Sequence, residues 1–286
     1  MWLKITVLVL ISLAVCIAGA IVYGTLRWQG KTKDIHAKIE AARLAIKTVT
    51  YDAREIESLP APVQRYFRAV LKEGQPIIAV ARFSHEGQFR IKESEDRWTP
   101  FTSNQIATTR PAGFVWDARI RMAPGVTAFV HDAYVAEEGI LHAEALGLVT
   151  VADLSGTPAA AQGELLRYFA EAAWYPTALL PSQGVRWEAM DDSTARATLT
   201  DGATTVSLEF SFDSEGLITS LNAASRYHGD VDGVPEFAPW QGRFWAYEIR
   251  NGMRIPLEGE VAWQFPEGPL PYWRGRITEI GYEFAR

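Results

Sequence analysis

The chain has 286 residues, of which 48% are hydrophobic and 12% aromatic, so it can form a substantial folded core. Its formal net charge of −6 argues against a nucleic-acid-binding protein, which needs a concentrated basic surface. The single cysteine, Cys16, lies in the N-terminal apolar run. The folded part therefore has no disulfide, no thiol nucleophile and no cysteine metal ligand.

An uncharged run of 22 residues occupies positions 5–26. As a helix it would be about 33 Å long, which matches a hydrocarbon core of about 30 Å. Trp2 precedes the run, Tyr23 lies near its end and Trp28 follows it, as expected for aromatic residues at a membrane interface. We interpret the run as a transmembrane anchor, with the membrane as its partner.

Two cleavage sites compete with an uncleaved anchor. Residues 18–20 read Ala-Gly-Ala, which resembles a signal-peptidase site. Residues 13–16 resemble a lipobox, although Val15 occupies a position where a small residue is expected. Cleavage at either site would leave apolar residues at a new terminus, so the uncleaved anchor is our interpretation.

Two features of the sequence favour opposite orientations of the span. Arg27, Lys31 and Lys33 follow the run, and the positive-inside rule would then favour a cytoplasmic domain. A β-rich, tryptophan-rich domain behind one N-terminal span is, however, a common extracytoplasmic design. We therefore predict a single-pass protein of the inner (plasma) membrane with an extracytoplasmic domain.

Helical spacing returns after the span. Apolar residues over 34–49 predict a juxtamembrane helix with Asp34 as its N-cap, and a second helix is predicted over 62–72. The domain organisation that we expect is an anchor with its basic flank at 1–33, a juxtamembrane helix and linker at 34–58, and a single β-rich domain at 59–286.

Strand patterns dominate the remainder of the chain. Asp201-Gly202 and Asn251-Gly252 are two-residue hairpin signals, because glycine accepts the positive φ of a type I′ turn. Short turns between consecutive strands favour an antiparallel meander. The predicted strands are 77–83, 88–92, 105–109, 114–122, 126–135, 140–151, 185–190, 195–200, 203–213, 217–227, 243–250, 253–265 and 274–284.

One long helical pattern interrupts the strands, in the stretch LLRYFAEAAWYPTALLP at 165–181. Leu165 and Phe169 fall on an apolar stripe, whereas Arg167, Glu171 and Trp174 lie opposite, and Pro176 places the helix end near Trp174. We predict a mainly β (α+β) fold: a large curved antiparallel meander sheet or half-barrel with one central helix packed against it, preceded by a transmembrane helix and short helices.

Common catalytic motifs are absent from the sequence, including G-x-S-x-G, the P-loop and G-x-G-x-x-G. His142 and Glu144 share one face of a predicted strand, but two ligands do not make a metal site, and we interpret them as surface residues. His228 and the acids after it resemble a calcium loop whose ligand ladder is incomplete. No metal and no cofactor is predicted.

The mixed face of the central helix supplies the candidate ligand-binding residues. If that face lines a cavity, Arg167 and Glu171 become polar contacts; otherwise they form an ordinary intrahelical pair. Phe169, Trp174 and Trp116 would be apolar walls, and Asp117 has the same ambiguity as Glu171.

Several motifs together resemble a bacterial family that is catalogued only as a domain of unknown function. They are LPAPVQRYF (59–67), WTPFTSNQ (98–105), GFVWDARIRM (113–122), RYFAEAAWYPTALLP (167–181), GVRWE (184–188) and GMRIPLEGEVAW (252–263). The resemblance covers nearly the whole chain after the anchor and implies no established activity. The general form of this family is similar to that of lipoprotein-carrier half-barrels, in which a curved sheet holds a helix and a hydrophobic ligand.

Three functions remain open from the sequence. The first is a membrane-anchored envelope module that binds a lipid or other lipophilic small molecule, and it requires a cavity beside the central helix. The second is a structural or assembly factor, which would show an exposed apolar patch instead. The third is a hydrolase-like enzyme with Glu171 or Asp117 as acid or base. Three convergent polar groups in one pocket, one with a strongly shifted pKa, would favour the enzyme.

Overall fold

The computed structural model describes residues 2–286 and contains one curved antiparallel sheet of 13 strands. The predicted fold class is therefore confirmed. The first six strands are β1 (Ile78–Arg90), β2 (Trp98–Thr109), β3 (Ala112–Ala123), β4 (Val126–Val135), β5 (Glu138–Ala145) and β6 (Val149–Ser155). The other seven are β7 (Arg186–Ala189), β8 (Thr194–Asp201), β9 (Thr204–Phe212), β10 (Ile218–Val231), β11 (Val234–Arg250), β12 (Met253–Phe265) and β13 (Gly268–Phe284).

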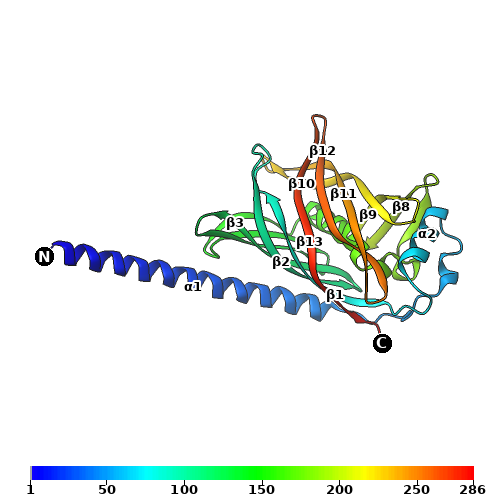
Figure 1. Ribbon diagram of the computed structural model, residues 1–286, viewed down its shortest axis with the longest axis horizontal. Helices are drawn as coiled ribbons and strands as arrows, with labels where there is room; N and C mark the ends of the chain where they lie inside the picture. The colour runs from blue at the N-terminus through cyan, green and yellow to red at the C-terminus, as the bar shows by residue number, and fades with distance from the viewer. Residues whose placement is uncertain (1) are drawn as a thin grey trace.

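Two meanders meet in the middle of this sheet. The strand order is β6-β5-β4-β3-β2-β1-β13-β12-β11-β10-β9-β8-β7. The first and last strands, β1 and β13, therefore pair at the centre of the sheet. The two strands from the middle of the chain, β6 and β7, form its opposite edges. Helix α3 (Pro158–Glu171) follows the edge strand β6 and leads towards the opposite edge strand, β7. Figure 1 shows the sheet curling around this green helix, as in a half-barrel.

Helix α3 begins and ends for local reasons. The Thr157 hydroxyl accepts a hydrogen bond from the Ala160 amide at 3.1 Å, and Pro158 occupies the first turn, where its missing N–H costs nothing. Short 3₁₀ turns at Ala172–Trp174, Pro176–Leu179 and Pro181–Gln183 then continue the chain. The helix thus starts earlier than its apolar stripe indicated, and the predicted end near Trp174 is confirmed.

The centre of the sheet depends on a glycine. Gly87 lies in β1 opposite Gly275 of β13, and a Cβ at position 87 would lie 2.1 Å from the Arg274 carbonyl oxygen. The sequence pattern had suggested a break at Gly87, but β1 runs through it as one strand. Glycine is present here because the neighbouring backbone approaches closely, not because the chain turns.

Two other boundaries differ from the sequence pattern. The predicted strand at 140–151 is split into β5 and β6 by a turn at residues 146–148, where Leu146 and Gly147 both have positive φ. Asn251 and Gly252 form the predicted hairpin turn with φ of 48° and 81°. At the other predicted turn, Asp201 pairs with Thr204, so the turn is shifted by one residue.

Helix α1 (Trp2–Ala42) is continuous from the apolar run into the predicted juxtamembrane segment. An N-cap at Asp34 is therefore wrong, and the helix stops at Ala42 rather than extending to residue 49. The described N-terminal part is exposed, whereas Trp28 and Ile39 are buried against the outer face of the sheet. Figure 1 shows the helix projecting beyond the sheet at its N-terminal end. Helix α2 (Ala61–Val70) matches the predicted second helix closely.

Candidate ligand-binding cavity

A cavity of about 540 Å³ lies between α3 and the inner face of the sheet. Its size falls within the roughly 300–1,000 Å³ of small-molecule sites. The walls are mainly aromatic and aliphatic, and they come from both halves of the sheet. Apolar lining residues include Phe89, Trp116, Ile120, Met122, Val130, Leu141, Leu154, Trp174, Phe244, Val261 and Trp273.

Arg167 of α3 organises one polar group in this cavity. Its guanidinium forms ion pairs with Asp132 of β4 and, at 2.8 Å, with Glu171 one turn further along α3. Glu171 also accepts a hydrogen bond from Gln105 of β2. The Arg167 guanidinium lies 4.9 Å from the ring centre of Trp116, so the cation also covers an aromatic wall. Arg167 thereby holds the helix to the first half of the sheet.

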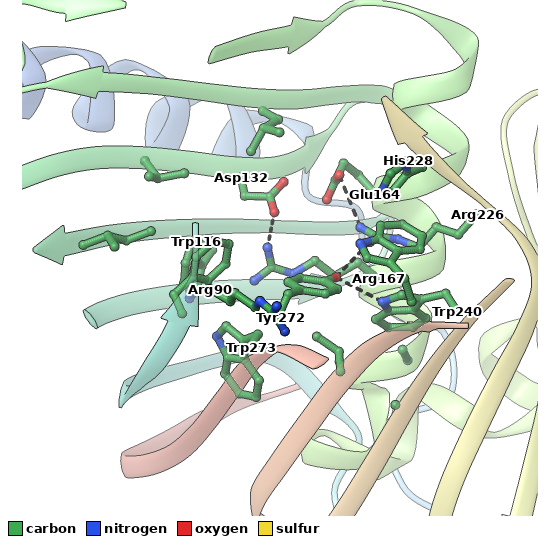
Figure 2. Close-up of a pocket in the computed structure, with 18 of the residues that line it drawn as sticks. Arg90, Trp116, Asp132, Glu164, Arg167, Arg226, His228, Trp240, Tyr272 and Trp273 are labelled. Atoms are coloured by element: carbon green, nitrogen blue, oxygen red, sulfur yellow. Dashed lines mark hydrogen bonds and ion pairs between the residues drawn. The ribbon is translucent and has the colours of Figure 1, made fainter. Parts of the chain in front are cut away.

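Arg226 of β10 organises a second polar group on the opposite side. Its Nε donates to the carbonyl of Gly163 at 3.0 Å, and its Nη1 donates to the Tyr272 hydroxyl at 3.2 Å. The same hydroxyl accepts from the Trp240 indole at 3.0 Å. Figure 2 shows these side chains at the end of the cavity formed by the second half of the sheet, with Arg167 between them and Asp132.

Glu164 of α3 lies between the two groups. Its side chain is 9% exposed, and one carboxylate oxygen is 3.6 Å from Arg226 Nη2. Burial raises the pKa of Glu164 well above its ordinary value, and the negative charge of Asp132 adds to this, while Arg226 opposes it. Burial and the nearby Asp132 charge therefore favour the protonated form of the Glu164 carboxyl.

Four polar atoms that border the cavity have no hydrogen-bond partner among residues 2–286. They are the indole nitrogens of Trp116 and Trp174, one oxygen of Asp132 and one oxygen of Glu164. Nothing in the described chain accepts a hydrogen bond from the two indoles. Buried N–H groups are nearly always paired in folded proteins, so these two donors are available to a bound molecule or to water.

The structure brings four of the six predicted ligand-binding residues together. Arg167, Glu171, Trp116 and Trp174 all line the cavity. Phe169 does not: it is buried on another side of α3 and packs against Phe210, with ring centroids 5.9 Å apart. The apolar stripe of α3, which includes Phe169, packs into the hydrophobic core, whereas the mixed stripe with Arg167 and Glu171 lines the cavity.

Asp117 is also outside the cavity. It follows Trp116 in β3, and successive strand residues face opposite sides of a sheet, so its carboxylate lies on the outer face. There it accepts a hydrogen bond from the Trp28 indole at 2.9 Å. Trp28 is fully buried and stacks on His131, with ring centroids 4.0 Å apart. The interpretation of Trp28 as an aromatic residue at the membrane interface is therefore wrong, because its side chain is buried inside the protein.

His142 and Glu144 belong to the same contact between α1 and the sheet. Glu144 is buried, and it forms ion pairs with Lys31 at 2.6 Å and Arg27 at 3.2 Å. Burial raises the pKa of Glu144, but hydrogen bonds from Lys31 and His142, together with the nearby cations, outweigh it and leave the pKa below its ordinary value. These residues lie on the outer face of the sheet, as predicted, but α1 covers them, so they are not at the solvent-exposed surface.

Sequence reasoning missed the residues that come from distant strands. Arg226 and Tyr272 carried no local pattern, and Asp132 lies on β4, 35 residues before Arg167 in the chain. Glu164 had a detectable signal, because it precedes Arg167 by three residues and so shares its helix face. Within residues 2–286, no three His, Cys, Asp or Glu side chains are arranged to hold a metal ion.

A second hollow, of about 620 Å³, lies between α1 and the outer face of β1, β2 and β13. Two of its charged lining residues, Arg82 and Glu40, pair with each other, and Arg82 also pairs with Glu283. These side chains are also close to half exposed, and solvated ion pairs give little selectivity. We therefore place the candidate site in the inner cavity.

Comparison with known proteins places the chain in a family without an assigned function. No curated protein matches the sequence. Among solved structures, a LolA superfamily protein from Nitrosomonas europaea is similar, with a TM-score of 0.45 and 7% identity over 79% of this chain and 94% of that one. A domain from Vibrio parahaemolyticus described as outer membrane lipoprotein-sorting has a TM-score of 0.35 and 8% identity over 72% of this chain and 86% of its own. Residues 57–282 match a family of unknown function, DUF6920, and the chain belongs to that family.

Proposed function

We propose that this protein is a membrane-anchored module of the cell envelope that binds a lipid or another lipophilic molecule. The observation that carries the proposal is the cavity of about 540 Å³ between α3 and the sheet. It combines apolar walls with a small number of convergent polar groups, which is the composition of small-molecule sites. A solid core beside α3 would have argued against binding.

Helix α1 supplies the anchor in this proposal. It is long and apolar enough to cross a membrane, with a mean hydropathy of 2.9 in its most apolar window, none of which is buried. The same unbroken helix continues into the segment that packs on the sheet, which supports an anchor that remains attached to its domain. We assign it to the inner membrane, with the β-rich domain outside the cytoplasm.

The polar groups of the cavity have different roles in binding. Arg167 and Glu171 satisfy each other, so we assign them to holding the walls in position rather than to direct contact. Trp116 and Trp174 each present an unpartnered indole N–H among the described residues. A carbonyl, ester or hydroxyl oxygen of the ligand is the group that these donors would bind.

The experiment is native mass spectrometry of the full chain released from detergent micelles, followed by organic extraction. Ala143 lines the cavity, so Ala143→Phe places an aromatic ring inside it and narrows it, while Thr219→Phe adds the same ring at an exposed position of β10. We expect a stoichiometric lipophilic adduct on the wild type and on Thr219→Phe, and its loss from Ala143→Phe. An adduct that survives Ala143→Phe would place binding elsewhere, and a wild type that stays free after incubation with membrane lipids would refute the proposal.

Acid–base catalysis is the second candidate, and one observation favours it. Glu164, with its raised pKa, lies in the same cavity as Asp132, Arg167 and Glu171, so three convergent polar groups surround a shifted carboxyl. Binding remains preferred because Asp132 and Glu171 are both engaged by Arg167. Incubation with lipid esters separates the two: product formation that Glu164→Gln abolishes would establish catalysis, and unchanged esters would exclude it for that substrate class.

A further inference from the structure

The turn between β5 and β6 is fixed to α1 inside the apolar run. A Cβ at Gly24 would lie 2.2 Å from the Leu146 carbonyl oxygen and 2.9 Å from the Leu148 side chain, so the helix and the turn touch at a position that only glycine allows. One turn of helix later, Arg27 Nη1 donates to the Gly147 carbonyl at 2.9 Å. The turn at residues 146–148 therefore cannot move along α1 independently.

This contact determines how deep the turn lies if α1 spans a bilayer. Gly24 is two residues before the end of the uncharged run at 5–26, which corresponds to about 3 Å along a helix. Arg27 is the first charged residue after the run. A span that fills a hydrocarbon core of about 30 Å therefore brings Gly24, and the turn with it, to the boundary between acyl chains and headgroups.

The hairpin itself has the composition of a membrane contact. Residues 145–152 read ALGLVTVA and contain no charge. Val149 is 63% exposed and Val151 is 50% exposed, both on β6, which is the edge strand of the sheet. Edge strands in water normally carry charges or proline that prevent association, and this one carries neither over its first four residues. In Figure 1 the green strands beside β3 extend along α1 towards its N-terminal half.

We propose that residues 145–152, the membrane hairpin, insert into the interface of the same bilayer that holds α1. The hairpin also forms part of the cavity, because Val151 and Ala152 are among its lining residues. The β6 wall of the cavity then lies at the bilayer surface. In this arrangement a lipophilic molecule can pass between the bilayer and the cavity without crossing water. This step rests on the proposed function, since it requires that the cavity binds such a molecule.

The test uses the full chain in vesicles of phosphatidylcholine and phosphatidylglycerol, with an NBD fluorophore on a single cysteine. Cys16 is the only native cysteine and lies in the apolar run, so the Cys16→Ser background allows one label at Val149→Cys or at Ile249→Cys. These two positions are similarly exposed, at 63% and 66%, but Ile249 lies near the far end of β11, beside the turn to β12. Lipids with a nitroxide near the headgroup report contact with the interface.

We expect blue-shifted emission and loss of most of the fluorescence for the label at 149, and no quenching at 249. Equal behaviour at the two positions would overturn the proposal. Gly24→Leu should restore fluorescence at 149 by separating the turn from α1, whereas Gly19→Leu should not, since a Cβ at position 19 meets nothing within 4 Å. Restored fluorescence with Gly19→Leu as well would also contradict it.

The label on native Cys16 separates this proposal from the proposed anchor. Quenching at Cys16 by lipids with a nitroxide deep in the acyl chains shows that α1 is inserted. Quenching at Cys16 without quenching at 149 refutes the membrane hairpin and leaves the anchor intact. Absence of quenching at Cys16 refutes the anchor, and the membrane hairpin with it.

Discussion

Arg167 of α3 and Asp132 of β4 form a buried ion pair that joins the central helix to the wall of the cavity. Both side chains are at most 15% exposed, and Glu171 occupies the other side of the same guanidinium. The charges of Glu171 and Asp132 raise the pKa of Arg167 against the opposing effect of burial, so the cation persists at all ordinary pH values. The geometry of the cavity thus depends on one arginine.

We expect Arg167→Met to destabilise the fold by about 3–5 kcal/mol, because it leaves two buried carboxylates without their cation. Urea unfolding followed by tryptophan fluorescence measures the change. The matched control is Arg196→Met, which removes an exposed pair with Glu209 and should leave the free energy of unfolding nearly unchanged. Similar losses for both variants would show that the Arg167 pairs do not hold α3.

Gly87→Ala should weaken the junction between the two meanders. The added Cβ would lie 2.1 Å from a backbone oxygen of β13, and relieving such an overlap costs about 1–3 kcal/mol or more. Gly281→Ala is the control in the same strand pair, since a Cβ there meets nothing within 4 Å. Thermal unfolding should show a lower Tm for the first variant only, and equal Tm values would contradict the close approach.

Trp28→Ala should release α1 from the outer face of the sheet. The side chain is fully buried, donates to Asp117 and stacks on His131, and loss of a buried tryptophan costs about 3–5 kcal/mol. Hydrogen exchange of the full chain in micelles should show faster exchange in α1 beyond residue 28 and in β3 to β5. Leu44→Ala, at a position 63% exposed, should leave these rates unchanged. Protection that persists in Trp28→Ala would mean that the ion pairs of Glu144 hold α1 alone.

Acid should weaken the fold through His131. Burial lowers the pKa of His131 to about 4, although the charge of Asp117 raises it. Between pH 6.5 and 4 the unfolded chain therefore binds a proton that the folded chain does not, and the free energy of unfolding falls as the pH falls. His131→Gln should make this decrease smaller, as measured by urea unfolding across that range.

The decrease should not vanish in His131→Gln, because burial also lowers the pKa of His85, to about 3. An unchanged pH dependence in the variant would show that His131 does not contribute. A decrease that becomes larger would mean that His131 is protonated in the folded chain, contrary to its burial.

The cavity residues show which signals are readable from one sequence. Arg167, Glu171 and Trp174 lie within eight residues, so helical spacing alone placed them on one face. Arg226 and Tyr272 lie far from them in the chain and join them only because the two meanders curl towards each other. Trp116 and Asp117 show what local spacing cannot decide. Strand alternation predicts that their side chains lie on opposite faces of the sheet, but it does not indicate which face lines the cavity.

The sequence by itself determined the antiparallel meander, the central helix and the apolar N-terminal run, because each depends on local periodicity, turn residues and helix stops. Only the tertiary structure decided that β1 pairs with β13, that α3 borders a cavity instead of a solid core, and that Trp28 of α1 is buried against the outer face of the sheet. Those features depend on contacts between segments far apart in the chain. Their free energy comes from burial and charge pairing across the whole sheet, which no local pattern of residues encodes.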